Sequence, residues 1–427
     1  MRVFAKILLL TVFLFFNCKQ ANRTQKIADK SERLEIVGLN KRITNDLSEF
    51  KESEYLSRQF EYFLRRWDMT GMSVAIVKDE KLVYAHGFGY SDKEKNETVT
   101  PGNVFRLASV SKLITAIAIL KLVENKKLSL DSKVFGENAI LNDSILIKAK
   151  DKHLKTITVR HLLAHSAGWS QRYGDPAFNS LSIAQKQNDP PPATIQTYYK
   201  YIATRNLHFK PGSSTSYSNM GYMFLGEVIS KVSGMPYEEY IQEEILIPNG
   251  IVDMHIGASL ENGRLPNEVK YYEQKDSPLI ASFDGSGQMV RKTYGGNPIE
   301  LLGPAGGWVA SSIELAKLLV LVDGYKKVED IIPARLLREM TNDERTRGPL
   351  GWLRVNKDGT WYRTGSMAGT SAMIKRGNKN ISWVVLFNSS SWKGSTFSNE
   401  INSLMNKVVG RVKNWPDQDL FNYYPPK

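Results

Sequence analysis

The chain has 427 residues, of which 42% are hydrophobic and 24% are charged. This composition excludes a wholly disordered protein and is enough for one large core or two subdomains. Lysine and arginine number 57 against 44 acidic residues, for a formal charge of +13, but they are spread along the chain without a nucleic-acid-binding module, so we expect no nucleic-acid partner. Cys18 is the one cysteine, which excludes an intrachain disulfide and a thiolate-ligated zinc site.

The N-terminal segment has the layout of a secretory signal. Arg2 and Lys6 are positive, and residues 7–16 form an apolar run that is too short to cross a bilayer as a helix, which takes about 20 residues. Cys18 follows this run and resembles the cysteine of a bacterial lipobox, although residues 15–17 are larger than is usual there.

This resemblance implies that residues 1–18 are a signal peptide with a lipobox-like end. Cys18 would then carry a lipid that anchors an exported lipoprotein in the membrane of the bacterial envelope. A plain cleaved signal and an uncleaved anchor are the alternatives.

The segment after the signal is polar. Residues 19–55 are rich in Lys, Glu, Asn and Ser and contain few aromatic residues, which predicts a flexible tether outside the fold. We expect one folded domain over residues 56–412 and an irregular C-terminal tail over residues 413–427.

Strand patterns lie near both ends of this domain. Residues 72–92 contain two runs rich in Val and Ala around a polar turn at 78–81, and residues 361–391 contain further strands around a turn at 376–379. Helical patterns lie between them, at residues 109–124, 158–164, 220–233, 237–247 and 312–323. This order predicts an α+β fold, in which an antiparallel sheet is flanked by helices and a mostly helical subdomain is inserted, with a cleft between the two parts.

Ser109 and Lys112 form an S-x-x-K pair at the start of the first predicted helix. Residues three apart share a helix face, so the hydroxyl and the amine can meet beside the unpaired N–H groups of the first turn. A serine nucleophile needs a base, and a lysine desolvated against a buried helix can lose its proton near neutral pH. Taken alone, the pair is more typical of a helix-capping serine followed by a surface lysine.

Tyr217 and Asn219 form a second element just before the predicted helix over residues 220–233. The phenol can relay a proton, and the amide can donate to a substrate carbonyl and hold Lys112 in place. Taken alone, Tyr217 is more typical of a packed aromatic residue with a satisfied hydroxyl.

A third element, Arg363-Thr364-Gly365, lies in a strand punctuated by glycine. Gly365 permits close approach of another backbone. A strand edge of this kind can pair with a substrate backbone and present an N–H group to a developing oxyanion. A strand with a bulge is the alternative.

Together the three elements resemble the signature motifs of the serine β-lactamase and penicillin-binding-protein family, in its class C-like branch. The stretches at residues 157–169, 217–229 and 305–318 are also similar to that family. The resemblance implies an acyl-enzyme route in which Ser109 attacks an amide, lactam or ester carbonyl. It also implies that Lys112 and Tyr217 share the proton transfers, with the base unassigned between them, and that the N–H groups of Ser109 and Ser366 form the oxyanion hole.

One position departs from that family. Arg363 stands where Lys or His is usual, and a guanidinium suits a carboxylate but is effectively unable to accept a proton. We therefore expect Arg363 to bind an anionic part of the substrate, with Asn219, Thr364, Gly365 and Ser366 as the other substrate-binding residues. The substrate is a small molecule or a peptide, and the branch includes D,D-peptidases, D-aminopeptidases, amide hydrolases and esterases, so the fold does not choose among them.

Two other readings compete with an enzyme. A lipoprotein that has kept the fold and lost catalysis could act as a binding or scaffold protein, and Arg363 is the feature that supports it. A basic surface protein that binds an anionic polymer has only the net charge behind it. His161 and His165 stand four apart like a zinc pair, but no third ligand is evident, so we expect structural roles, no metal and no cofactor.

Overall fold

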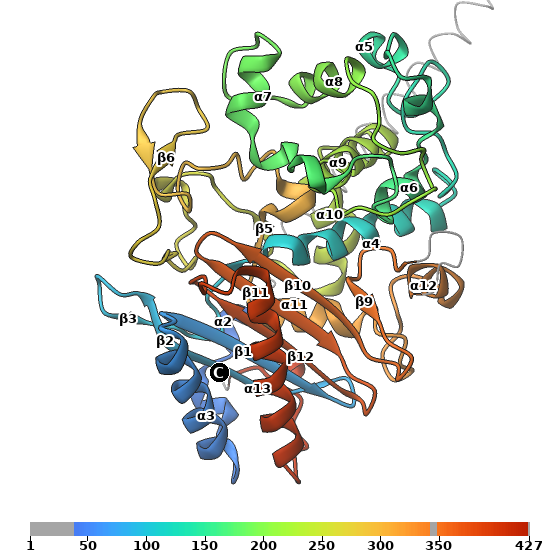
Figure 1. Cartoon of the computed structure of the whole chain (residues 1–427). Coiled ribbons are helices and arrows are strands. Elements are labelled where there is room, and N and C mark those ends of the chain that lie inside the picture. Colours follow the sequence, from blue (N-terminus) through green and yellow to red (C-terminus); the bar gives the residue numbers. More distant parts are fainter. Residues whose placement is uncertain (1–37, 342–347, 426–427) are drawn as a thin grey trace, which may run out of the picture.

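The structure, a computed structural model, describes residues 38–341 and 348–425. At its centre lies a seven-stranded antiparallel sheet in the order β3-β2-β1-β12-β11-β10-β9 (Figure 1). The two strands at its middle, β1 and β12, come from opposite ends of the chain and pair with Val74 opposite Val385. The strands are β1 (Gly71–Lys78), β2 (Lys81–Asp92), β3 (Glu97–Thr98), β9 (Arg354–Val355), β10 (Trp361–Met367), β11 (Thr370–Arg376) and β12 (Ile381–Phe387). The predicted α+β class with an antiparallel sheet is confirmed.

Helices cover both faces of the sheet. Helices α3 (Ser53–Trp67) and α13 (Ser398–Arg411) lie together on one face (Figure 1) and share a core cluster with Val74. Helix α11 (Ser312–Val320) contacts β1 and β12 and belongs to the larger cluster, which contains Ala75. Because neighbouring residues of a strand face opposite ways, β1 is apolar at nearly every position.

A mostly helical part lies above the sheet in the view of Figure 1. It contains α5 (Ser144–Ile147), α6 (Val159–Leu163), α7 (Ser180–Lys186), α8 (Ile195–Ala203), α9 (Asn219–Ser233) and α10 (Tyr237–Ile241). Three short elements form a small sheet beside it, β4 (Phe105–Arg106), β8 (Trp308–Ala310) and β5 (His255–Ile256), while β6 (Ile280–Ala281) pairs with β7 (Met289–Val290). Helix α12 (Ala334–Thr341) packs Leu336, Leu337 and Met340 into the larger cluster. No helix within the described ranges is long and apolar enough to cross a membrane.

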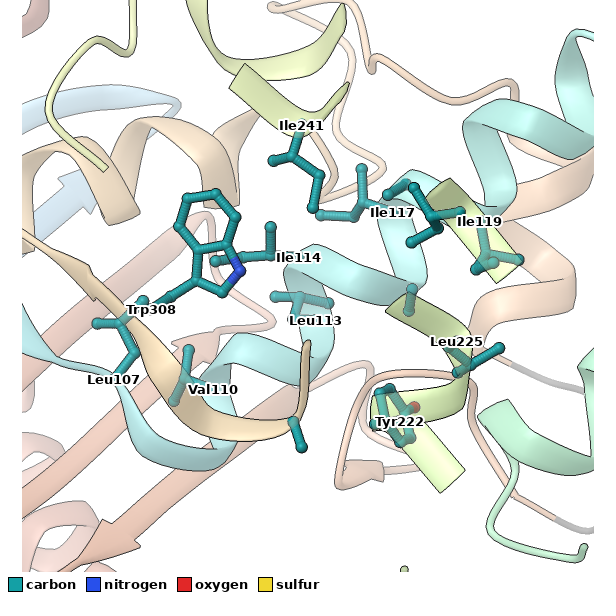
Figure 2. Packing of buried hydrophobic residues seen from close by; sticks show 14 of the residues in the cluster. Leu107, Val110, Leu113, Ile114, Ile117, Ile119, Tyr222, Leu225, Ile241 and Trp308 are labelled. Carbon is teal, nitrogen blue, oxygen red and sulfur yellow. The ribbon is translucent and has the colours of Figure 1, made fainter. Parts of the chain in front are cut away.

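Helix α4 (Ser111–Glu124) runs between the sheet and the helical part, and nearly all of its 14 residues are buried. Its apolar side chains meet residues from α9, α10 and β8, as Figure 2 shows for Tyr222, Leu225, Ile241 and Trp308. A helix that is apolar on every side has to be buried. The first turn of α4, which contains Lys112, is therefore held in place by packing on every side.

The folded part begins earlier than the sequence pattern indicates. Helix α2 (Leu39–Arg42) and the 3-10 turn Asn45–Ser48 pack onto the core, and Leu39 and Ile43 are buried. The prediction of a tether over residues 19–55 is therefore wrong from residue 38 onward. The remainder of that tether, the signal peptide and Cys18 lie outside the described residues.

This segment folds because its side chains form hydrogen bonds to the outer edge of β2. Ser48 Oγ accepts a hydrogen bond from the Ala85 N–H at 2.8 Å and donates to the Ala85 carbonyl at 2.7 Å. Asn45 Oδ1 accepts from the Gly87 N–H at 2.9 Å. Side chains of the segment thus satisfy backbone groups that the short strand β3 leaves open, and they cover a sheet edge.

Candidate active site

The site lies where α4, the loop before α9 and strand β10 meet. Ser109 belongs to the 3-10 turn Ala108–Val110 immediately before α4. Ala108 adopts a φ of 46°, a left-handed conformation that costs about 1–3 kcal/mol in a residue other than glycine and clusters at functional sites. Strand β10 passes so close to this turn that a Cβ atom at Gly365 would lie 2.2 Å from the Leu107 carbonyl oxygen. The predicted close approach at Gly365 is thus present.

Lys112 is completely buried beneath Ser109. Its Nζ lies 3.2 Å from Ser109 Oγ and 2.5 Å from Asn219 Oδ1, and it also donates to the Ala305 carbonyl. Burial lowers the pKa of Lys112 to about 8, and the charge of Arg363 acts in the same direction. Lys112 can therefore lose its proton close to neutral pH.

The contacts of Lys112 show where a free lone pair would point. Asn219 Oδ1 and the Ala305 carbonyl can only accept hydrogen bonds, so they hold two N–H groups of Lys112 in either protonation state. A neutral amine has two N–H groups, and its lone pair is left for the third neighbour, Ser109 Oγ. This arrangement allows Lys112 to take the serine proton.

Tyr217 also contacts Ser109. Its hydroxyl donates to Ser109 Oγ at 2.6 Å, and the ring lies with its centroid 4.9 Å from Lys112 Nζ. Burial by itself raises the pKa of Tyr217, but the positive charges of Lys112 and Arg363 outweigh burial and lower it. Both Lys112 and Tyr217 thus have pKa values lowered toward neutrality, and either can exchange a proton with Ser109.

Arg363 is buried and contacts two parts of the centre. It is only 1% exposed; its Nε donates to the Ser109 carbonyl at 2.8 Å and its Nη2 to the Tyr217 hydroxyl at 3.0 Å. Arg363 also borders a cavity of about 420 Å³ beside Trp352, which offers an anion a route to it. Its observed role is to hold Tyr217 and the Ser109 backbone, and the binding of an anionic substrate group stays a prediction.

Asn219 connects the centre to a residue that the sequence patterns did not reveal. While its Oδ1 accepts from Lys112, its Nδ2 donates to Asp175 Oδ2 at 2.5 Å. The expected hold on Lys112 is present. One of the two N–H groups of the amide is engaged by Asp175, so the expected donation to a substrate carbonyl depends on the other N–H group and stays a prediction. Asp175 Oδ1 in turn accepts from the Ala177 N–H at 3.1 Å and caps the 3-10 turn Pro176–Phe178. No short-range motif marks Asp175 as a member of the site.

His165 supports Tyr217 from behind. The two ring centroids are 4.4 Å apart, His165 Nδ1 accepts from the Ser218 N–H at 3.1 Å, and its carbonyl accepts from the Ser216 N–H at 2.8 Å. Burial, together with the charges of Arg363 and Lys112, lowers the pKa of His165 well below its usual range. A neutral His165 therefore braces the loop that carries Tyr217.

His161 faces elsewhere and completes the capping box of α6 with Thr158. The two histidines have separate structural roles, as their sequence setting indicates.

The remaining predicted residues follow the alternation of strand β10. Arg363 and Gly365 are buried, whereas Thr364 and Ser366 on the opposite face are half-buried. Ser366 and Ser109 border the same small cavity of about 10 Å³, together with Asn219. The oxyanion role of the Ser109 and Ser366 N–H groups stays a prediction. An oxyanion hole needs both residues to border one space, and both border this cavity.

An antiparallel sheet joined to a helical part, with a serine, a buried lysine and a tyrosine meeting at the junction, defines the β-lactamase and transpeptidase type of fold. Residues 57–403 match the model of the Beta-lactamase family. The chain belongs to this family, whose members are usually serine hydrolases.

Two kinds of relative with known names share part of the sequence. "Protein flp" of Staphylococcus aureus (strain MRSA252) is 28% identical over 241 residues, which are 56% of this chain and 44% of that protein. "Penicillin-binding protein 4*" of Bacillus subtilis (strain 168) is 27% identical over 234 residues, 53% of this chain and 43% of that protein. The matches thus span less than half the length of these relatives.

Solved structures share the fold over most of the chain. A D-amino acid amidase from Ochrobactrum anthropi SV3 superposes with a TM-score of 0.64 at 20% identity, over 84% of this chain and 98% of that one. The D-alanine carboxypeptidase AmpC from Burkholderia cenocepacia gives a TM-score of 0.61 at 18% identity, over 84% and 99%. At these identities the likeness is one of fold.

Proposed function

We propose that the chain is a serine hydrolase that cleaves amide, lactam or ester bonds through an acyl-enzyme on Ser109. One observation supports this most: Ser109 Oγ has Lys112 Nζ at 3.2 Å and the Tyr217 hydroxyl at 2.6 Å, so two proton-transferring groups converge on one nucleophile. D,D-peptidase, amidase and esterase activity all fit this chemistry.

In the proposed reaction, Ser109 Oγ bonds to the carbonyl carbon while Lys112 or Tyr217 receives its proton. The bond to the leaving nitrogen or oxygen then breaks, and the leaving group takes that proton. Water then reverses these steps. Its oxygen bonds to the acyl carbon as Lys112 or Tyr217 takes a proton from it, the bond to Ser109 Oγ breaks, and that proton returns to Ser109. Arg363 stays protonated throughout and offsets negative charge on Tyr217.

The test is acylation of the full chain, purified from membranes in detergent, by a fluorescent penicillin and separately by a p-nitrophenyl ester. Ser109→Ala serves as the control in both experiments. We expect either an adduct on Ser109, measured by intact mass, or product release that depends on Ser109, measured by absorbance. A slowly lost adduct indicates a penicillin-binding type of site, and rapid turnover indicates a hydrolase. If neither reagent reacts at Ser109, the scaffold function replaces the enzyme.

We also propose that the protein is exported and anchored in the bacterial envelope by a lipid on Cys18. The support is the sequence alone: a charged start, a short apolar run and a cysteine directly after it. Metabolic labelling with an alkyne fatty acid, compared between the wild type and Cys18→Ser, tests it. Label that persists in Cys18→Ser would show that the cysteine is not the attachment point.

A further inference from the structure

A cavity of about 410 Å³ opens on one side of Tyr217, and Asp175 stands in its wall. Three aromatic residues, Trp169, Tyr173 and Tyr201, line the same cavity. We name it the Asp175 cavity. It adjoins the catalytic centre, because Tyr217 lies in its wall and also donates to Ser109.

Asp175 is a carboxylate whose hydrogen-bond donors in the structure are neutral. Its two oxygens accept from Asn219 Nδ2 and from the Ala177 N–H, and no lysine or arginine of the described ranges forms a salt bridge with it. Each carboxylate oxygen has two acceptor positions, so capacity for a further donor remains. The side chain is half-buried, where a carboxylate attracts a cation more strongly than it does in bulk water. Its charge also acts on Lys112, from which Asn219 separates it.

The aromatic residues favour the same ligand. A protonated amine is attracted to the faces of tryptophan and tyrosine rings as well as to a carboxylate. The basic residues of the cavity, Lys150 and Arg205, lie at its exposed rim, and the Arg205 guanidinium already stacks over the Tyr201 ring at 4.6 Å. Tyr173 is 70% exposed and stacks on His208 at 4.4 Å, so it also belongs to the rim. The inner wall, with Asp175 and the buried Trp169, is therefore acidic and aromatic.

We propose that the Asp175 cavity binds a protonated amine on the acyl part of the substrate, so that the enzyme prefers aminoacyl amides or esters with a free amino group. Asp175 makes no covalent bond. Its place is set by the hydrogen-bonded series Asp175, Asn219, Lys112 and Ser109, which keeps the carboxylate close to the scissile carbonyl. The proposal rests on the proposed function and names its substrate class.

The experiment compares D-alanine p-nitroanilide with N-acetyl-D-alanine p-nitroanilide at pH 7, using the full chain in detergent. Acetylation removes the charge of the amine and leaves the scissile bond unchanged. We expect wild-type kcat/KM to favour the free amine by about tenfold or more, the size of a hydrogen bond to a charged group. Asp175→Asn keeps an acceptor for Asn219 but removes the charge, so the preference should fall to near one.

Asp189→Asn is the matched control, because Asp189 pairs with Lys200 outside the Asp175 cavity, and it should keep the wild-type preference. Protection of Ser109 from a fluorescent penicillin, by D-alaninamide against N-acetyl-D-alaninamide, gives the same comparison if turnover is slow. An equal loss for both substrates in Asp175→Asn, or a wild-type preference for the acetylated compound, overturns the proposal. Absence of any Ser109-dependent reaction, with penicillin included, instead overturns the proposed function.

Discussion

Arg363 Nη2 lies 3.0 Å from the Tyr217 hydroxyl oxygen, which itself lies 2.6 Å from Ser109 Oγ. A permanent cation is thus one hydrogen bond away from the group that contacts the nucleophile. A lysine or histidine in this position could exchange a proton with Tyr217, whereas arginine can only stabilise negative charge on it. The departure from the family pattern at position 363 therefore changes the electrostatics of the centre, while Arg363 still forms hydrogen bonds to Tyr217 and to the Ser109 carbonyl.

Replacement of Arg363 should slow acylation. We expect Arg363→Met to lower the rate by about 10- to 100-fold, because a charge-assisted hydrogen bond to Tyr217 is lost. Arg363→Lys should lose less, since it keeps the charge without the planar fork. The measurement is the second-order rate of labelling by a fluorescent penicillin, with the melting temperature as the control for folding. A Met variant that labels at the wild-type rate would contradict this role.

The pH dependence of acylation should follow Lys112. Its neutral form is the one that accepts a proton, and burial lowers its pKa to about 8, so the rate should rise with pH to a plateau above a midpoint near 8. Arg363→Met should move this midpoint to higher pH, because the charge of Arg363 also lowers the pKa of Lys112. A rate that is constant from pH 6 to pH 9 in the wild type would exclude a titrating base in this range.

Asn219→Asp tests the contact between Asn219 and Lys112 with almost no change of shape. A carboxylate 2.5 Å from Lys112 Nζ stabilises the ammonium form, and the variant also removes the hydrogen bond to Asp175 and places a second carboxylate beside it. Both carboxylates favour the ammonium, so the midpoint of the pH profile should rise by about one unit or more. Asn406→Asp, which adds the same charge on the exposed side of α13, should leave the midpoint unchanged. Equal profiles for the two variants would show that Asn219 does not govern Lys112.

Gly365→Ala should disturb both stability and activity. The added Cβ would lie 2.2 Å from the Leu107 carbonyl oxygen, so β10 or the turn bearing Ser109 has to move, at a cost of about 1–3 kcal/mol. Gly410→Ala is the control, because a Cβ there has open space within helix α13 and should be neutral or slightly stabilising. Thermal unfolding and penicillin labelling of both variants provide the comparison, and a Gly365→Ala protein with wild-type values would refute the tight approach.

Residues 38–53 should contribute to the stability of the domain. A chain that begins at Glu54 loses the buried Leu39 and Ile43, and it leaves the Ala85 N–H and carbonyl without the Ser48 hydroxyl. We expect it to unfold with at least about 3 kcal/mol less stability than a chain that begins at Gly38. Denaturant unfolding of the two proteins measures the difference, and coincident curves would restore the tether interpretation for this segment.

The features that depend on neighbouring residues follow from the sequence. Ser109 and Lys112 are three residues apart, one helical turn fixes their relation, and the apolar body of the helix predicts its burial. The same holds for Tyr217 and Asn219 at the start of α9, and for the hairpins β1–β2 and β11–β12. The spacing of Leu39, Ile43 and Leu47 was an available signal for the missed N-terminal packing.

Tertiary structure decided the partners that are distant along the chain. Asn219 meets Asp175 across 44 positions, and Lys112 meets the Ala305 carbonyl across 193. A backbone carbonyl carries no residue signature, and one carboxylate in a loop resembles any other until the fold places it. The orientation of Arg363 toward Tyr217 depends on how closely β10 passes the Ser109 turn. Hydrogen bonding and burial at these contacts are properties of packing, and they set the pKa values on which the chemistry depends.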